Sequence, residues 1–274
     1  MIKAFAPGNL SCIFIICPHK DPKKMGSLGV GIATSKGVIV SVMKSGKIEI
    51  RVNNKRIRFP TVSDVVNNLA KEPVEVRIKY QLPYGCGFGM SGASALATSY
   101  ALNRLFDLRK SKKQLAMVAH VAEVRNRTGL GDVGGQYNGN IYAKYKKGNP
   151  LEGVRLPIKD KFVYYKILGP LDTKKVITND RIKKNINKAG LKSLKKIKSL
   201  RKITLKKLIE ISKEFSVESN LLVDKRVKKL IESIENKGNV ASMVMLGNAV
   251  YSDKPFIGSK KLEISRKGAY VLST

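Results

Sequence analysis

Several features that mark other classes of protein are missing from this 274-residue sequence. It has no tryptophan, two histidines and three cysteines, and these form neither a CxxC pair nor a histidine cluster, so the sequence offers no zinc site. No run of about 18 apolar residues occurs, which argues against a membrane-spanning helix. The chain also lacks the pattern of a signal peptide. We therefore expect a cytoplasmic protein with reduced cysteines and no membrane partner.

Acidic residues are scarce as well, since 20 Asp and Glu stand against 53 Lys and Arg, and the formal net charge is +33. Such an excess can serve a polyanionic partner, because clustered cations release counterions when they meet phosphates. Much of it lies in residues 181–207, where four apolar residues recur with a spacing of three: Leu191, Leu194, Ile197 and Leu200. This pattern predicts an amphipathic helix with its apolar face inward and its lysines in water.

A nucleic-acid-binding face is the alternative interpretation of this basic segment. Aromatic residues, on which the bases of a single strand would stack, do not alternate with its cations. We therefore favour the solvated helix face and treat nucleic acid as an unlikely partner.

The remaining sequence is that of a globular chain with 43% hydrophobic residues. Short β-branched or alternating segments predict strands at residues 2–5, 29–33, 38–43, 47–52, 74–82 and 162–167. Helices are predicted over residues 91–106 and, capped by Ser111, as far as Arg127, and residues 180–236 are helical in pattern. The expected fold is α+β with two lobes, a mixed α/β N-terminal lobe in residues 1–160 and a helix-rich C-terminal lobe in residues 161–274.

A glycine-rich segment, residues 83–95, joins the strand at 74–82 to the helix that follows. Its alternating glycines, Gly85, Gly87 and Gly89, permit left-handed backbone angles and a close approach to a ligand. Free N–H groups and the dipole at the helix start favour phosphate oxygens, and Ser91 can offer a hydroxyl to a phosphate or to Mg²⁺. Neither the Walker pattern nor the dinucleotide fingerprint is present, so the alternative is a tight turn that packs a helix against a strand.

Two carboxylates follow this segment, Glu123 near the end of a helix and Asp132 after a glycine turn. One could ligate Mg²⁺ and the other could accept the proton of an attacking hydroxyl. The alternatives are an exposed Glu123 paired with Arg127 at i+4 and an ordinary turn residue at Asp132. His120 lies on the same side of the helix as Glu123 and could donate to a substrate.

At these residues the sequence resembles the GHMP kinase superfamily, whose phosphate loop has the approximate form Pro-x-x-x-Gly-Leu-Gly-Ser-Ser-Ala-Ala. The matching residues are Pro83, Gly87, Gly89, Ser91 and Ala93, while Phe88, Met90 and Gly92 replace Leu, Ser and Ala. Within the superfamily the sequence is most similar to the archaeal pantoate kinases. Four segments carry this similarity: residues 26–31, the loop with Phe88, residues 119–136 and residues 241–247.

The resemblance implies a two-lobed GHMP-kinase-like fold, ATP as phosphate donor, Mg²⁺ as cofactor and the terminal hydroxyl of pantoate as acceptor. Homoserine and shikimate kinases are the alternatives within the superfamily. Asp132 is implied as the catalytic carboxylate, and Ser91 and Glu123 as the residues of the Mg²⁺–phosphate site. The implied nucleotide-binding residues are Pro83, Gly85, Gly87, Phe88, Gly89, Met90, Ser91, Gly92 and Ala93. The implied pantoate-binding residues are Ser27, His120, Lys144 and Thr173.

The sequence departs from the superfamily pattern at three places. Lys144 stands where the pantoate kinases would place an arginine for the substrate carboxylate, which keeps the charge but loses the bidentate fork. Asn9 replaces a lysine that many members carry, and the third motif is reduced to Leu246-Gly247-Asn248. We also expect a homodimer, since two-fold dimers are the commonest assembly.

Overall fold

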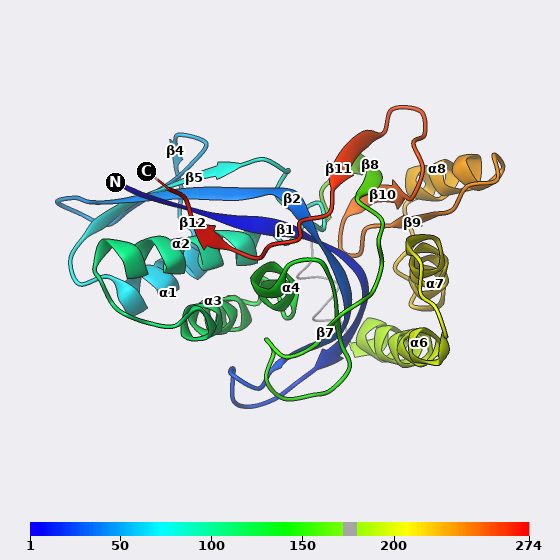
Figure 1. Cartoon of the computed structure of the whole chain (residues 1–274), viewed down its shortest axis with the longest axis horizontal. Coiled ribbons are helices and arrows are strands. Elements are labelled where there is room, and N and C mark those ends of the chain that lie inside the picture. Colours follow the sequence, from blue (N-terminus) through cyan, green and yellow to red (C-terminus); the bar gives the residue numbers. More distant parts are fainter. Residues whose placement is uncertain (172–179, 274) are drawn as a thin grey trace.

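The computed structural model describes residues 1–171 and 180–273, which form two lobes, each built on its own sheet (Figure 1). The strands of the first sheet are β1 (Ile2–Cys17), β2 (Gly26–Lys44), β3 (Glu49–Val52), β4 (Lys55–Arg56), β5 (Val74–Tyr80), β6 (Ile141–Lys144), β7 (Val154–Arg155) and β12 (Tyr270–Val271). The strands of the second sheet are β8 (Phe162–Gly169), β9 (Ala241–Met243), β10 (Asn248–Ser252) and β11 (Lys260–Glu263). The helices are α1 (Pro60–Leu69), α2 (Met90–Leu105), α3 (Lys112–Asn126), α4 (Asp132–Asn138), α6 (Asp180–Ser199), α7 (Leu205–Glu218) and α8 (Lys225–Glu235).

The first sheet has the order β12-β1-β2-β5-β3-β4, with β6 beside β2 and β7 beside β6. Its pairings are antiparallel except for that of β3 with β5. The second sheet has the order β11-β8-β10-β9 and is antiparallel. Sheets and helices together confirm the expected α+β fold.

Strands β1 and β2 are much longer than the sequence pattern predicts. The predicted strand at 2–5 extends to Cys17, and the predicted strands at 29–33 and 38–43 are parts of the continuous β2. Shifts in the pairing of the two strands, at Pro7/Gly8 and Ser11/Ile13, mark bulges that bend the ribbon. The bent ends curve toward α6, as the dark blue ribbon of Figure 1 shows, and Gly190 of α6 lies close to Ile15.

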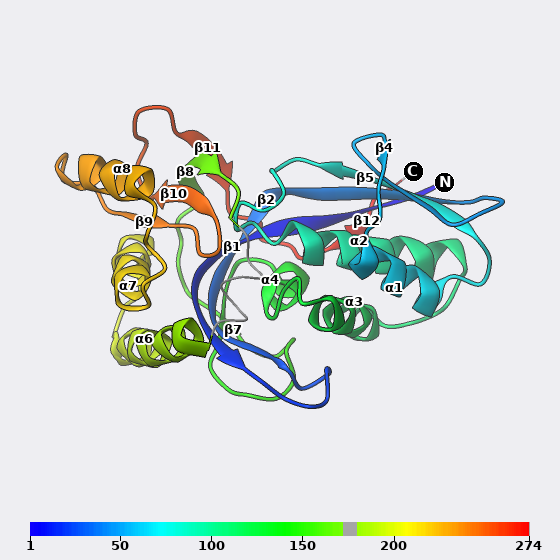
Figure 2. The same cartoon turned by 180° about the vertical axis from the view of Figure 1, so that it is seen from behind.

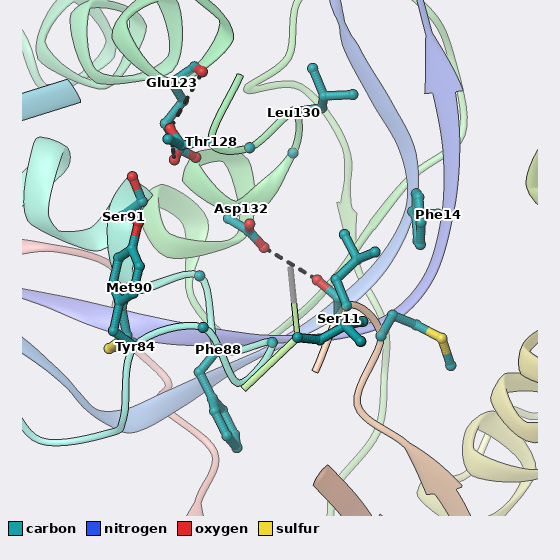
Figure 3. A pocket seen from close by; sticks show the side chains of 18 of the residues that line it. Ser11, Phe14, Tyr84, Phe88, Met90, Ser91, Glu123, Thr128, Leu130 and Asp132 are labelled. Atoms are coloured by element: carbon teal, nitrogen blue, oxygen red, sulfur yellow. Dashed lines mark hydrogen bonds between the residues drawn. The ribbon is translucent and has the colours of Figure 1, made fainter. Parts of the chain in front are cut away.

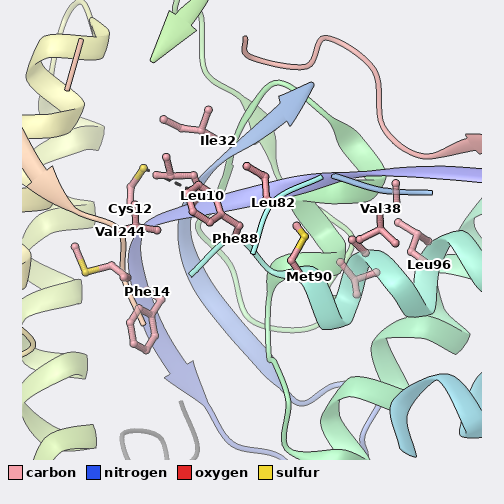
Figure 4. Close-up of a cluster of buried hydrophobic side chains, with 14 of the residues drawn as sticks. Leu10, Cys12, Phe14, Ile32, Val38, Leu82, Phe88, Met90, Leu96 and Val244 are labelled. Carbon is pink, nitrogen blue, oxygen red and sulfur yellow. Dashed lines mark hydrogen bonds between the residues drawn. The ribbon is translucent and has the colours of Figure 1, made fainter. Parts of the chain in front are cut away.

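Helix α2 lies at the centre of the first lobe, between the sheet and helices α1 and α3. Every residue from Met90 to Leu102 is buried, as expected of a core helix, and the helix reaches solvent only in its last turn, at Arg104. The hydroxyl groups of Ser94 and Thr98 donate to carbonyl oxygens one turn earlier, at 2.8 and 2.7 Å, which satisfies them inside the core. Figure 4 shows Leu96 of this helix together with Leu82 and Phe88, which belong to the same buried cluster.

The second lobe covers its sheet with α7 and α8, while α6 packs between α7 and β1. Leu194 and Ile197 of α6 are buried as predicted, but Leu191 is 61% exposed, so its place on the apolar face was wrongly predicted. At 3.6 residues per turn a spacing of three drifts by about 60° at each step, and Leu191 falls outside the buried stripe. Ile186 lies in that stripe instead.

Most lysines of α6 are exposed and none is buried, in agreement with the solvated-face interpretation. Lys192 and Lys196 form ion pairs with Glu218 and Glu214 of α7, which offset part of the local positive charge. No helix in the described part of the chain is both long and apolar enough to cross a bilayer.

The two ends of the described chain lie close together, because β12 pairs with β1 on the first sheet (Figure 2). The first lobe therefore includes residues from both ends of the sequence. The expected division at residue 160 stays a prediction. β7 ends at Arg155 and β8, the first strand of the second sheet, begins at Phe162.

Candidate active site

The glycine-rich loop connects β5 to the N-terminus of α2. Gly85, Gly87 and Gly89 all have left-handed backbone angles, with φ of 76°, 82° and 63°. Gly89 is also the N-cap of α2 and has no side chain that could cover the first free N–H groups of the helix. The predicted backbone conformation is thereby confirmed, and these amides remain available to an anionic ligand.

Contacts from both lobes hold the loop in place. The Asn9 amide donates to the Phe88 carbonyl, and the Leu171 amide donates to the Gly85 carbonyl, each at 2.9 Å. A Cβ on Gly87 would lie 2.7 Å from the Met245 carbonyl oxygen, so the loop backbone touches the second lobe directly. The Phe88 ring is buried, 5.4 Å from the Tyr165 ring between centroids, and points away from the loop's ligand side (Figure 3).

A cavity of about 540 Å³ opens in front of this loop (Figure 3). Its walls come from the loop, from the segment between α3 and α4, from β1 and β2, and from the second lobe. The described residues that line it are Ser11, Phe14, Ser27, Tyr84, Gly85, Gly87, Phe88, Gly89, Met90, Ser91, Glu123, Arg127, Thr128, Gly129, Leu130, Gly131, Asp132, Pro170, Leu171, Met245 and Leu246.

Both predicted carboxylates line the cavity. Glu123 lies in the last turn of α3, is 1% exposed and accepts a hydrogen bond from Thr128 Oγ1 at 3.1 Å. Its burial and the nearby carboxylate of Asp132 raise its pKa to about 8. The alternative interpretation, an exposed Glu123 paired with Arg127, is therefore excluded, because the carboxylate is buried and has a hydroxyl partner.

Asp132 is the first residue of α4, a short helix that the sequence pattern did not predict. Its Oδ1 accepts hydrogen bonds from Asn9 Nδ2 at 2.8 Å and from Ser11 Oγ at 3.2 Å. Burial raises the pKa of Asp132, and these two hydrogen bonds offset part of that effect. Asn9 thus orients this carboxylate without adding a charge.

The surroundings of Ser91 and Glu123 fit a small, hard cation. Ser91 Oγ is buried and has no hydrogen-bond partner, and it faces the same cavity as the Glu123 carboxylate. Glu123 Oε2 lies between Gly92 and Gly129, where a Cβ would be 2.7 and 2.4 Å away. Among the described residues no group of three potential metal ligands occurs, but Mg²⁺ needs one or two carboxylates when phosphate oxygens and water complete its shell.

The predicted pantoate-binding residues lie in different places. Ser27 lines the large cavity, and it also lines a smaller adjoining cavity of about 50 Å³ together with Lys144. Lys144 is buried, and its ammonium donates to the Asn149 and Glu152 carbonyls at 2.5 and 3.2 Å. His120 is buried with Nε2 2.8 Å from the Met25 carbonyl oxygen, outside the lining of both cavities. Thr173 lies outside the described residues.

The predicted nucleotide-binding residues also divide into two groups. Gly85, Gly87, Phe88, Gly89, Met90 and Ser91 line the large cavity. Pro83, Gly92 and Ala93 do not, and Gly92 instead leaves room for the Glu123 carboxylate.

Sequence reasoning missed several residues that build the cavity. Gln136 of α4 donates through Nε2 to the Gly89 carbonyl at 2.7 Å and so ties α4 to the start of α2. Leu246, named above in the reduced third motif, also lines the cavity, and its left-handed φ of 63° was not predicted. Ser11 was missed because no local pattern links it to Asp132, which lies 121 residues later. The left-handed backbone of Leu246 could not be predicted from the sequence either, since glycine and asparagine are the residues that usually adopt that conformation.

Comparison with known proteins agrees with this geometry. The sequence profile of the GHMP kinases N terminal domain matches residues 60–140, which include the glycine loop and both carboxylates. The chain is 32% identical over 252 residues to a pantoate kinase of Methanocaldococcus jannaschii, covering 90% of each protein. It is 30% identical over 266 residues to a pantoate kinase of Thermococcus kodakarensis, covering 92% of this chain and 87% of the relative.

Among solved structures, the chain resembles a phosphotransferase related to the CoA biosynthesis pathway. The TM-score is 0.86 at 27% sequence identity, and the match covers 98% of both chains. Sequence and structure therefore place this chain, over nearly its whole length, in the GHMP kinase family beside its pantoate kinase members.

Proposed function

We propose that this protein transfers the γ-phosphate of ATP to the terminal hydroxyl of pantoate and forms 4-phosphopantoate for coenzyme A biosynthesis. The observation that carries the proposal is that the glycine loop and two buried carboxylates, Glu123 and Asp132, face one cavity. The similarity to pantoate kinases over 90% or more of the chain supports pantoate as the acceptor.

The nucleotide would place its phosphate chain against the loop between Gly85 and Ser91. The left-handed glycines and the uncapped start of α2 offer backbone N–H groups there, and the helix dipole favours negative charge. The remaining predicted nucleotide residues, Pro83, Gly92 and Ala93, would act by shaping the loop rather than by direct contact.

Ser91 and Glu123 would hold Mg²⁺, through the unpartnered Oγ and the buried carboxylate. When bound, the ion neutralises charge on the phosphate oxygens and helps to orient the phosphate chain. Because the carboxylate pKa is raised, the cation would also displace the proton that Glu123 otherwise keeps near neutral pH.

The acceptor would lie between Asp132 and Ser27. Lys144 has three N–H donors, of which two are used by carbonyl groups, so one remains for the pantoate carboxylate in the smaller cavity. His120 would support this region through its hydrogen bond to Met25, the residue before β2. Thr173, outside the described residues, stays a prediction.

The transfer step would use Asp132 as the proton acceptor. The pantoate hydroxyl oxygen bonds to the γ-phosphorus, the bond from that phosphorus to the bridging oxygen breaks, and ADP leaves with the electron pair. The hydroxyl proton passes to Asp132, whose raised pKa suits a group that must take up a proton. Asn9 and Ser11 hold Oδ1 in hydrogen bonds, which leaves Oδ2 for the acceptor.

Three further parts of the proposal concern assembly and location. We propose a homodimer, on the frequency of two-fold dimers alone. The three cysteines are all unpaired and buried, which supports a reducing, cytoplasmic compartment. We retain the division into an ATP-binding lobe of residues 1–160 and a second lobe of residues 161–274.

An ATP-to-ADP assay with pantoate, homoserine, shikimate and mevalonate as acceptors tests the proposal. We expect Mg²⁺-dependent turnover with pantoate and a loss of kcat of about 10²- to 10⁴-fold in Asp132→Ala, the range of general-base catalysis. Turnover with another acceptor would overturn the choice of pantoate. Equal kcat in wild type and a folded Asp132→Ala variant would overturn the role of Asp132.

A further inference from the structure

Arg127 is the single cation among the described residues that line the large cavity. The same lining includes the carboxylates of Glu123 and Asp132, and residues 83–95 of the loop contain no lysine or arginine. A phosphate chain would bring several negative charges into this acidic setting. Backbone amides and one divalent ion offset part of that charge, and a nearby guanidinium would offset more.

The Arg127 guanidinium is exposed and has no carboxylate partner within the described part of the chain. The i+4 partner that the helix would suggest, Glu123, is turned inward to Thr128 and is wedged beside Gly129. Arg127 therefore keeps its full set of side-chain donors for a ligand.

Helix termination does not explain an arginine at this position. Arg127 is the C-cap of α3 and has left-handed backbone angles, with φ of 54° and ψ of 36°. Glycine adopts these angles at lower cost and is the usual residue there. The arginine side chain thus has no evident part in ending the helix, and its place at the cavity points to ligand binding.

The position of Arg127 within the cavity indicates which of the two possible anionic ligands it would bind, the nucleotide or the acceptor. The next residue, Thr128, has its hydroxyl 3.1 Å from that of Thr61 in α1. In Figure 3, Thr128, Glu123, Ser91 and Tyr84 lie on one side of Asp132, and Ser11 lies on the other. Arg127 directly precedes Thr128 in the chain and lines the same cavity, so we assign its backbone to the side of Ser91 and the start of α2.

We propose that the Arg127 guanidinium donates hydrogen bonds to phosphate oxygens of the bound nucleotide. This inference rests on the kinase function proposed above and adds a nucleotide-binding residue to it. Arginine suits such a role because its planar fork can donate two parallel hydrogen bonds to one phosphate group.

Direct binding measurements with ADP and adenosine test this role without any acceptor. In Arg127→Gly the guanidinium is lost and the backbone keeps a residue suited to its angles, so the Tm should not fall. We expect ADP to bind about tenfold more weakly, which corresponds to about 1.4 kcal/mol, and adenosine to bind as in wild type. Arg127→Lys should recover part of the loss, since it keeps the charge without the fork.

Arg125→Ala is the matched control, because Arg125 is exposed in the last turn of the same helix and does not line the cavity. Its ADP affinity should equal that of wild type. Unchanged ADP affinity in Arg127→Gly would overturn the inference, and so would a raised KM for pantoate with unchanged ADP binding. Tight ADP binding by a wild-type protein that phosphorylates none of the acceptors would refute the proposed acceptor but not the role of Arg127. A wild-type protein that binds no nucleotide would refute both.

Discussion

A methyl group added at residue 129 would test whether the position of the Glu123 carboxylate controls magnesium binding. In Gly129→Ala the new Cβ would lie 2.4 Å from Glu123 Oε2 and 2.9 Å from its Cδ, distances that real side chains do not tolerate. The φ of Gly129 is not left-handed, so the effect would come from this clash and not from backbone strain.

The structure sets the size of the expected displacement. An ordinary contact begins at 3.4 Å, so Oε2 must retreat by about 1 Å from its present 2.4 Å. Gly92 limits retreat on the other side, because its backbone already lies close to the same oxygen. The Thr128 hydrogen bond would be distorted, and overpacking of this kind costs about 1–3 kcal/mol of stability. We expect magnesium affinity to fall by about 10- to 100-fold, as when the support of a metal ligand is lost.

The assay is the initial rate of ADP formation against Mg²⁺ concentration, with ATP and pantoate saturating, together with the Tm of each protein. Gly46→Ala is the control, since its Cβ would meet no atom within 4 Å. The reasoning is refuted if Gly129→Ala needs no more Mg²⁺ than wild type for half-maximal rate.

Two further predictions concern pH and Lys144. In the folded, metal-free protein Glu123 keeps its proton up to about pH 8, whereas in the unfolded chain it loses that proton above about pH 4.5. The free energy of unfolding should therefore fall as the pH rises from about 4.5 to about 8. Thermal melts in a chelator should show this fall, and Glu123→Gln should flatten it; parallel curves for the two proteins would contradict the buried carboxylate. Lys144→Met should raise the KM for pantoate about tenfold, the effect of one charge-assisted hydrogen bond, and leave the KM for ATP unchanged. A lower Tm with an unchanged KM for pantoate would instead limit Lys144 to bracing the loop that contains Asn149 and Glu152.

Local features of the site were well predicted from the sequence. The three alternate glycines do have left-handed angles, and α2 begins one residue before the predicted start, at Met90. Ser111 caps α3 and forms a capping box with Gln114. These features depend on backbone angles and hydrogen bonds within a few residues, which local sequence controls directly.

Features that depend on distant contacts were predicted poorly. The sequence pattern divided the bulged ribbon of β1 and β2 into short strands, because Pro7 and the glycines within it disfavour strands. Pairing along the full length of the two strands compensates for these residues. Leu191 was assigned to the apolar face of α6 from spacing alone, although the buried stripe is set by what α7 and β1 present to that helix.

By itself the sequence determined a glycine-rich loop with left-handed backbone angles, two carboxylates that follow it and the family to which the chain belongs, because residue type and short-range spacing carry that information. Tertiary structure alone decided that Glu123 is buried rather than paired with Arg127, and that Asn9 and Ser11 hold Asp132. The physical reason is that burial, and the pKa shifts that follow from it, depend on groups from separate elements, and Asn9 and Ser11 lie more than a hundred residues before Asp132. Those groups meet only when the sheet and the helices pack together.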